Sequence, residues 1–93
     1  MKAVLFCGGW EDHDPEAFRA WADDLLSASG FEVESHDTLA PLADREAMAG
    51  ADLIVPIWSS ARSAHRPEFG TMTKEEEDGL LAAVAGGCGI AGW

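Results

Sequence analysis

The chain has 93 residues, enough for one small domain with its own core but fewer than a complete doubly wound α/β unit usually has. Its 17 acidic and 6 basic residues give a formal charge of -11, which repels phosphate backbones and anionic lipid. We therefore expect neither nucleic acid nor a membrane surface as a partner. The longest apolar run, residues 3–7, is too short for a membrane span or a signal-peptide core, so we expect a cytoplasmic protein.

The first half of the chain alternates between strand and helix patterns. Residues 3–7 are apolar throughout, as in a strand buried on both faces of a parallel sheet. Asp14 suits a helix N-cap, Pro15 suits the first helical position, and Gly30 ends the helix. Residues 31–36 then alternate apolar and polar, as a half-buried edge strand does. Large apolar side chains recur at helical spacing, and we expect Trp21 above all to lie in the core with its neighbours Phe18, Ala22 and Leu25.

The second half repeats this alternation. A short helix is expected over residues 43–49 and a third strand over 53–57. Thr73 and Glu76 form a capping box that opens a further helix, which the pair Gly86-Gly87 ends. Residues 88–91 then form a fourth strand. Three apolar residues are expected to face the core from the last helix: Leu80, Leu81 and Val84.

Right-handed crossovers convert this order of elements into a topology. The sequence predicts a flavodoxin-like, three-layer α/β fold around a parallel sheet of order 2-1-3-4. The first helix then covers one face, and the second and third helices cover the other. Because one face is only half covered, strands three and four should expose apolar side chains. We therefore expect an incomplete sheet, with residues 1–93 as the N-terminal part of a single longer domain.

Candidate site residues gather where ligands bind in open α/β sheets, at the carboxyl ends of the strands. The loop over residues 8–15 holds two glycines, an indole, an imidazole and three carboxylates. It faces the loop that begins at Trp58, and the chain reaches Trp93 at the same edge. Indoles at a wet cleft suit flat, partly apolar ligands such as the CH faces of sugars. The second loop adds side chains that could hold a carboxylate or a phosphate: Ser59, Ser60, Arg62, His65 and Arg66.

Each of these residues also has a structural interpretation. Asp14 is most simply a helix cap, and His13 is equally consistent with a solvated loop residue. Trp58 and Trp93 could simply cover the end of the sheet. The basic residues of the second loop could have no role beyond offsetting the negative charge of the chain. The two cysteines, in apolar segments, indicate buried thiols rather than a disulfide.

Several common chemistries lack their sequence signals. The loop after the first strand has no Ser or Thr for a flavin phosphate and no G-x-G-x-x-G fingerprint for a dinucleotide. The third strand ends in Pro56-Ile57-Trp58, without the Asp of a phosphoacceptor response regulator.

Five blocks in order resemble the ThuA-like, trehalose-utilisation family, in the class I glutamine amidotransferase-like superfamily. They are Gly8-Gly9-Trp10 with His13-Asp14-Pro15, Gly30 to Val33 with Asp37-Thr38-Leu39, Asp52 to Trp58, Thr73-Lys74-Glu75, and Gly89 to Trp93. The resemblance implies a flavodoxin-related fold about twice this length and a role in disaccharide, polyol or keto-sugar catabolism.

Three features of the chain limit what the resemblance implies. Amidotransferases place a nucleophilic Cys in a G-x-C-x-G turn, where this chain has Ala91 in Gly89-Ile90-Ala91-Gly92-Trp93. Glutamine hydrolysis by that route is therefore not expected. Residues 59–70 resemble an insertion, and the His-Gly segment that follows the Gly-Trp position in the family lies beyond residue 93.

The leading hypothesis is a protein of carbohydrate catabolism that binds a sugar or keto-sugar at the carboxyl edge. His13 is the acid/base candidate, and the residues expected to contact or position the sugar are Gly8, Gly9, Trp10, Asp14 and Trp58. The alternative is a non-enzymatic sugar-sensing or partner-binding module. A third is a metal site with His13 as one ligand. The sequence names no cofactor and leaves a homo-oligomer open.

Overall fold

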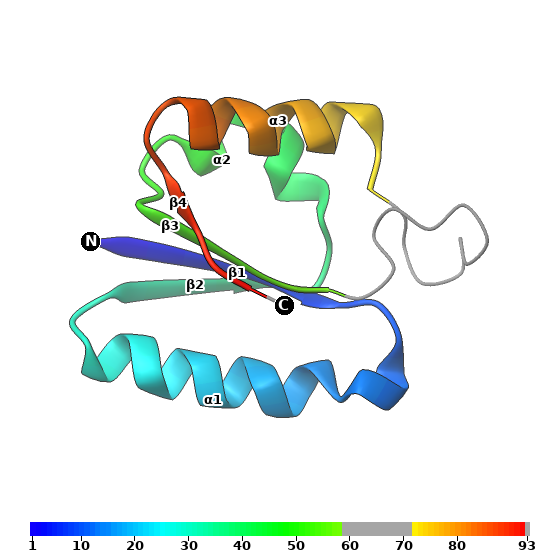
Figure 1. Cartoon of the computed structure of the whole chain (residues 1–93), viewed down its shortest axis with the longest axis vertical. Coiled ribbons are helices and arrows are strands. Elements are labelled where there is room, and N and C mark those ends of the chain that lie inside the picture. Colours follow the sequence, from blue (N-terminus) through cyan, green and yellow to red (C-terminus); the bar gives the residue numbers. More distant parts are fainter. Residues whose placement is uncertain (59–71, 93) are drawn as a thin grey trace.

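Four parallel strands form the centre of the structure (Figure 1). The computed structural model describes residues 1–58 and 72–92. The strand order is β2-β1-β3-β4, as the sequence predicts. β1 pairs with both β2 and β3, so the carboxyl ends of these three strands lie at one edge of the sheet. The strands are β1 (Lys2–Gly8), β2 (Glu32–His36), β3 (Leu53–Trp58) and β4 (Gly89–Ile90).

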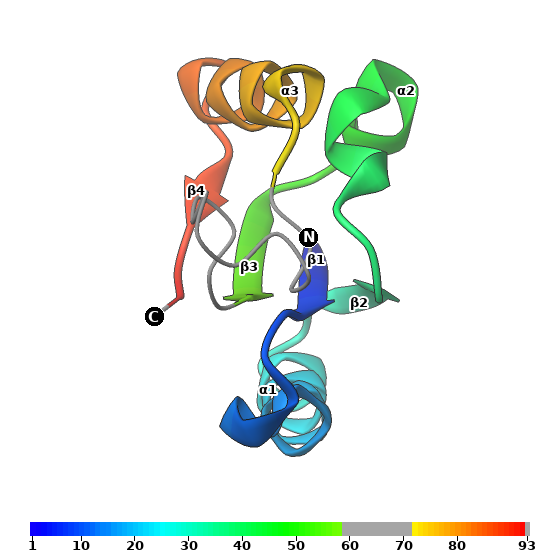
Figure 2. The ribbon, with the colours of Figure 1, turned by 90° about the vertical axis from the view of Figure 1, so that its right-hand side faces the viewer.

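Helices cover both faces of the sheet, with the expected distribution. Helix α1 (Pro15–Ala28) lies on one face, and α2 (Arg45–Met48) and α3 (Lys74–Ala85) lie on the other (Figure 2). Two short 3-10 helices precede α1 and α2, namely η1 (Glu11–His13) and η2 (Ala40–Ala43). In the part of the chain described, no helix has the length and apolar character needed to cross a membrane.

The predicted helix over residues 43–49 is shorter in the structure, because α2 spans only Arg45–Met48 and Ala43 belongs to η2. Asp44 interrupts it with an extended backbone (φ -95°, ψ 107°), and the Asp44 carboxylate accepts hydrogen bonds from the Glu46 and Ala47 N–H groups. Asp44 thus caps α2, because short acidic side chains satisfy the free N–H groups of a first helical turn. The Thr73–Glu76 capping box of α3 is confirmed, with both reciprocal hydrogen bonds present.

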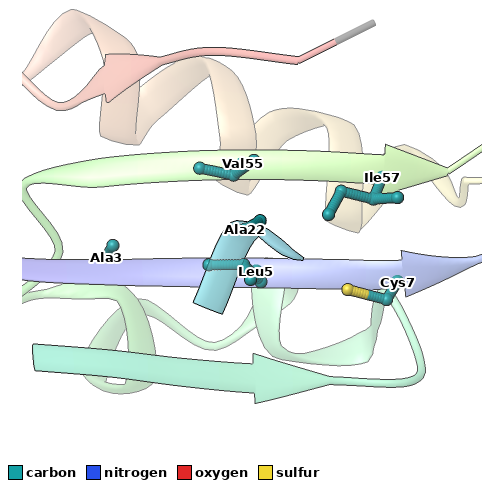
Figure 3. Close-up of a cluster of buried hydrophobic side chains, with 6 residues drawn as sticks. All are labelled: Ala3, Leu5, Cys7, Ala22, Val55 and Ile57. Carbon is teal, nitrogen blue, oxygen red and sulfur yellow. The ribbon is translucent and has the colours of Figure 1, made fainter. Parts of the chain in front are cut away.

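The core consists of two clusters separated by the sheet. On the α1 side, alternate residues of β1 pack with β3 and with Ala22 of the helix (Figure 3). On the other side, Val4 and Phe6 pack with Leu39, Leu42, Met48 and Ile54. Because successive side chains of a strand point to opposite faces, β1 supplies both clusters at once. This accounts for its unbroken apolar sequence.

Helix α1 is rotated relative to the expectation from its sequence. Ala22 faces the sheet and is 4% exposed, whereas Trp21 is 54% exposed. The prediction that Trp21 lies in the core is therefore wrong. The small Ala22 side chain and Leu26 make the contact with the sheet, and Trp21 lies one residue, or about 100°, around the helix from Ala22. Phe18 and Leu25 are exposed along the same flank.

Two further expectations about exposed apolar residues need correction. On β3, Val55 and Ile57 are buried, so this strand does not expose the apolar face that half coverage predicts. The fourth strand is shorter than expected, but its apolar Ile90 is exposed, as predicted for this strand. On α3, Leu80 packs against the core, but Leu81 and Val84 point outward. The buried residue of α3 is Gly79.

Gly79 sets how closely α3 approaches η2. A Cβ atom at this position would lie 1.7 Å from the carbonyl oxygen of Leu42, a backbone atom that has little freedom to move. Any larger residue therefore has to push α3 away from η2. Gly50 is a matched control, because a Cβ atom there would meet nothing within 4 Å.

We predict that Gly79→Ala lowers the free energy of unfolding by about 3 kcal/mol, the upper range for overpacking a core. Gly50→Ala should change it by less than about 0.5 kcal/mol. Urea denaturation of the two variants and the parent chain measures the difference. Equal midpoints for the two variants would contradict the close approach of α3 to η2.

Candidate functional site

The loop after β1 turns sharply at two residues with positive φ. Gly9 has φ 88° and Asp14 has φ 51° and ψ 59°, the left-handed region that few residues other than Gly, Asn and Asp adopt readily. Between them, η1 forms a single short turn, and the His13 N–H donates to the Trp10 carbonyl at 3.1 Å. The loop is therefore held by its own backbone before α1 begins.

Trp10 and His13 form a pair of rings at this turn. Their ring centroids lie 4.6 Å apart, and the ring planes are inclined by 60°. Trp10 is 37% exposed and His13 is also exposed, so both rings are accessible at the carboxyl edge. An indole beside an imidazole offers an apolar surface for a ring and a group that exchanges protons, within reach of one small ligand.

Gly8 and Trp58 form a second pair, across the register of β1 and β3. A Cβ atom on Gly8 would lie 2.5 Å from Cζ3 of the Trp58 indole, so the ring lies directly against the Gly8 backbone. Trp58 is half-buried and packs on the cluster that contains Val4 and Phe6. This packing fits the role of covering the end of the sheet, which the sequence allows. A contact between Trp58 and a sugar stays a prediction.

Asp14 caps α1, as its position predicts. Its Oδ1 accepts a hydrogen bond from the Ala17 N–H at 3.3 Å, and its carbonyl accepts one from the Phe18 N–H at 3.3 Å. The left-handed backbone of Asp14 is a feature that the sequence did not indicate. One residue thus turns the loop and starts the helix, while any contact of Asp14 with a ligand stays a prediction.

A pocket of about 400 Å³ opens between the ends of β1 and β2 and the first turns of α1. Sequence reasoning missed it, because its walls come from three separate segments. A usable signal was present: Asp37 follows β2 directly, and Arg19 is the only basic residue between positions 15 and 28. The residues that line the pocket are Cys7, Glu16, Arg19, Ser35, His36 and Asp37.

The thiols of both cysteines are held in the neutral form. Burial raises the pKa of Cys7 to about 11; the nearby Arg19 opposes this shift and Glu16 adds to it. Burial also raises the pKa of Cys88, and Asp52 adds to that shift. Because the thiolate is the nucleophile, neither cysteine suits covalent catalysis.

Other parts of the described structure offer less chemistry. A second pocket of about 240 Å³ lies between α2 and α3, at the amino edge of the sheet, and Arg45 is the charged residue in its lining. Over residues 1–58 and 72–92, no group of three His, Cys, Asp or Glu side chains is placed to hold a metal ion. The candidates Ser59, Ser60, Arg62, His65, Arg66 and Trp93 lie outside the described residues.

Comparison with known proteins adds no relative: no family model, no curated protein and no solved structure matches this chain.

We predict that Gly8→Ala lowers the free energy of unfolding by about 2 kcal/mol, because the new methyl group displaces the Trp58 indole. In a Trp58→Leu background the same change should cost at least about 1 kcal/mol less. A double-mutant cycle by urea denaturation measures this coupling. If the two costs add without coupling, the indole does not lie on Gly8 in solution.

The two roles of Asp14 predict an order among three substitutions. Asp14→Asn keeps both the cap and the tolerance for a left-handed backbone, so it should cost less than about 0.5 kcal/mol. Asp14→Gly loses only the side-chain cap. Asp14→Ala loses both and should cost about 2 kcal/mol. Thermal or urea unfolding tests the order, and an Ala variant as stable as the Asn variant would contradict it.

Proposed function

We propose that this protein belongs to the ThuA-like group and binds a sugar or keto-sugar at the carboxyl edge of its sheet, as a cytoplasmic protein of carbohydrate catabolism. The observation that carries the proposal is the exposed Trp10–His13 pair, with ring centroids 4.6 Å apart. Sugar rings commonly pack their CH faces on an indole, and acid/base work on a sugar carbonyl requires a group that exchanges protons near neutral pH.

In this proposal the Trp10 indole and the His13 imidazole have separate roles. Trp10 supports one face of the sugar and brings its carbonyl region toward the imidazole. His13 in the neutral form removes a proton from the hydroxyl-bearing carbon next to the carbonyl, which produces an enediolate. The proton of that hydroxyl moves to the former carbonyl oxygen, and the imidazolium returns its proton to the former carbonyl carbon, so the carbonyl has moved by one carbon. No net oxidation occurs, and His13 ends in its starting form.

The backbone around His13 supports this assignment. The His13 N–H is bonded to the Trp10 carbonyl, so the backbone fixes the imidazole's point of attachment relative to the indole. Asp14 turns the chain immediately afterwards and starts α1. Gly8 and Gly9 add no side chains of their own to the loop, and the Trp58 indole lies against Gly8.

We predict that His13→Ala reduces the conversion of 3-keto-disaccharides by about a hundredfold or more, a typical effect of losing a general acid/base. Product analysis by NMR measures this rate. His13→Gln is the matched polar control and should be equally slow, because an amide does not exchange protons at neutral pH. Unchanged turnover in either variant would refute the role of His13.

A second candidate function is a sugar-sensing module without catalysis. The raised pKa values of Cys7 and Cys88, together with Ala91 at the position of the amidotransferase nucleophile, favour it. Sugar titration followed by tryptophan fluorescence should change the signal under both functions. Only the enzyme converts the sugar, so fluorescence change without a product would support the sensing module.

A further inference from the structure

The pocket between β1, β2 and α1 has polar groups on most of its wall. Arg19 and Glu16 form a close ion pair, with Arg19 Nε 3.0 and 3.1 Å from the two Glu16 oxygens and Nη2 2.7 Å from Oε2. Glu16 thus engages Nε and Nη2 of the guanidinium, in a pair whose side chains are both exposed. Among the described residues, Nη1 of Arg19 has no hydrogen-bond partner and is available as a donor.

Asp37 supplies acceptors on another part of the same wall. It follows the last residue of β2 and lines the pocket, and its carboxylate makes no hydrogen bond or ion pair within residues 1–58 and 72–92. In contrast, the neighbouring His36 is engaged, because its Nε2 lies 2.9 Å from Glu34 Oε2 and its ring stacks on Phe6. Asp37 is therefore an exposed carboxylate at this end of β2 that is available to accept hydrogen bonds.

Ser35 adds a hydroxyl where a core residue would be expected. It is the register partner of Leu5, whose side chain packs in the α1-side cluster, so Ser35 occupies an inward-facing position of β2. Its Oγ is buried and has no hydrogen-bond partner among the described residues. A buried hydroxyl without a partner is costly, and one χ1 rotation redirects it. An apolar residue here would avoid this cost, so the hydroxyl suggests a polar occupant.

The charges of the pocket select the chemistry of that occupant. Two carboxylates outnumber one guanidinium, and the whole chain carries a formal charge of -11, which disfavours anions. Over the described residues no three ligand groups are placed for a metal ion. Neutral hydroxyl groups remain, because each both donates and accepts hydrogen bonds and so matches carboxylates, a hydroxyl and a guanidinium together.

We infer that this pocket binds the vicinal diol of a sugar ring, with Asp37 accepting hydrogen bonds from two adjacent hydroxyls and Arg19 Nη1 donating to one of them. A carboxylate just after the second strand of an open α/β sheet binds ribose hydroxyls in this manner in dinucleotide-binding folds. The diol comes from a free sugar or from the ribose of a nucleoside. The free-sugar alternative rests on the proposed function, whereas the nucleoside alternative does not.

Ligand-detected NMR on the full chain tests the site with three probes: methyl α-glucopyranoside, adenosine and 2′-deoxyadenosine. We expect at least one of the first two to bind, and 2′-deoxyadenosine, which lacks the vicinal diol, to bind about tenfold more weakly than adenosine or not at all. Asp37→Asn should weaken binding of the diol by about tenfold, since an amide replaces one of the two acceptor oxygens with an NH₂ donor. Arg19→Gln should also weaken binding of the diol, because the guanidinium donor is lost.

Asp24→Asn is the matched control, because Asp24 is an exposed carboxylate of α1 that does not line the pocket, and it should leave binding unchanged. Failure of both diol probes to bind, or equal binding by Asp37→Asn and the parent chain, overturns the diol site. Sugar binding that is lost in Trp10→Ala but unchanged in Asp37→Asn overturns this site and leaves the proposed function standing. Adenosine binding that depends on Asp37, without any sugar binding, supports the site and contradicts the proposed function.

Discussion

The two-sided burial of β1 is the constraint on which the rest of the structure depends. Residues 3–6 of this strand are fully buried, and Cys7 is nearly so. Such a strand has no solvent-facing side, so elements must cover both faces and strands must pair on both edges. α1 supplies one cover, η2, α2 and α3 supply the other, and β2 and β3 satisfy the edges. Both candidate sites are built where this strand ends.

Much of this fold was predictable because the decisive signals are local. The apolar run at residues 3–7, the Thr73–Glu76 box and the glycines after each long helix mark elements through their own backbone and side-chain chemistry. Right-handed crossovers then leave few topologies, and the observed order 2-1-3-4 is one of them. The cap at Asp14 was predictable for the same reason, because an N-cap requires only its own helix.

The failures concern properties that depend on distant contacts. Helical spacing marks the apolar stripe of α1 but not its angle to the sheet, which the small Ala22 decides by allowing close approach. As a result Trp21 is exposed. The pocket was missed because Cys7, Arg19 and Asp37 meet only after β1, α1 and β2 are assembled. The packing of the Trp58 indole on Gly8 likewise depends on the β1–β3 register, which neither segment indicates alone.

The contact between Gly8 and Trp58 makes the side-chain sizes at two positions 50 residues apart depend on each other. The Trp58 indole fills the space that Gly8 leaves by having no side chain. The packing at this edge therefore depends on both residues together. Among sequences with the same sheet edge, a side chain at position 8 is compatible only with a smaller ring or none at position 58. The sequence signal of this packing is therefore a glycine and a large ring at register partners of β1 and β3, and neither residue alone indicates it.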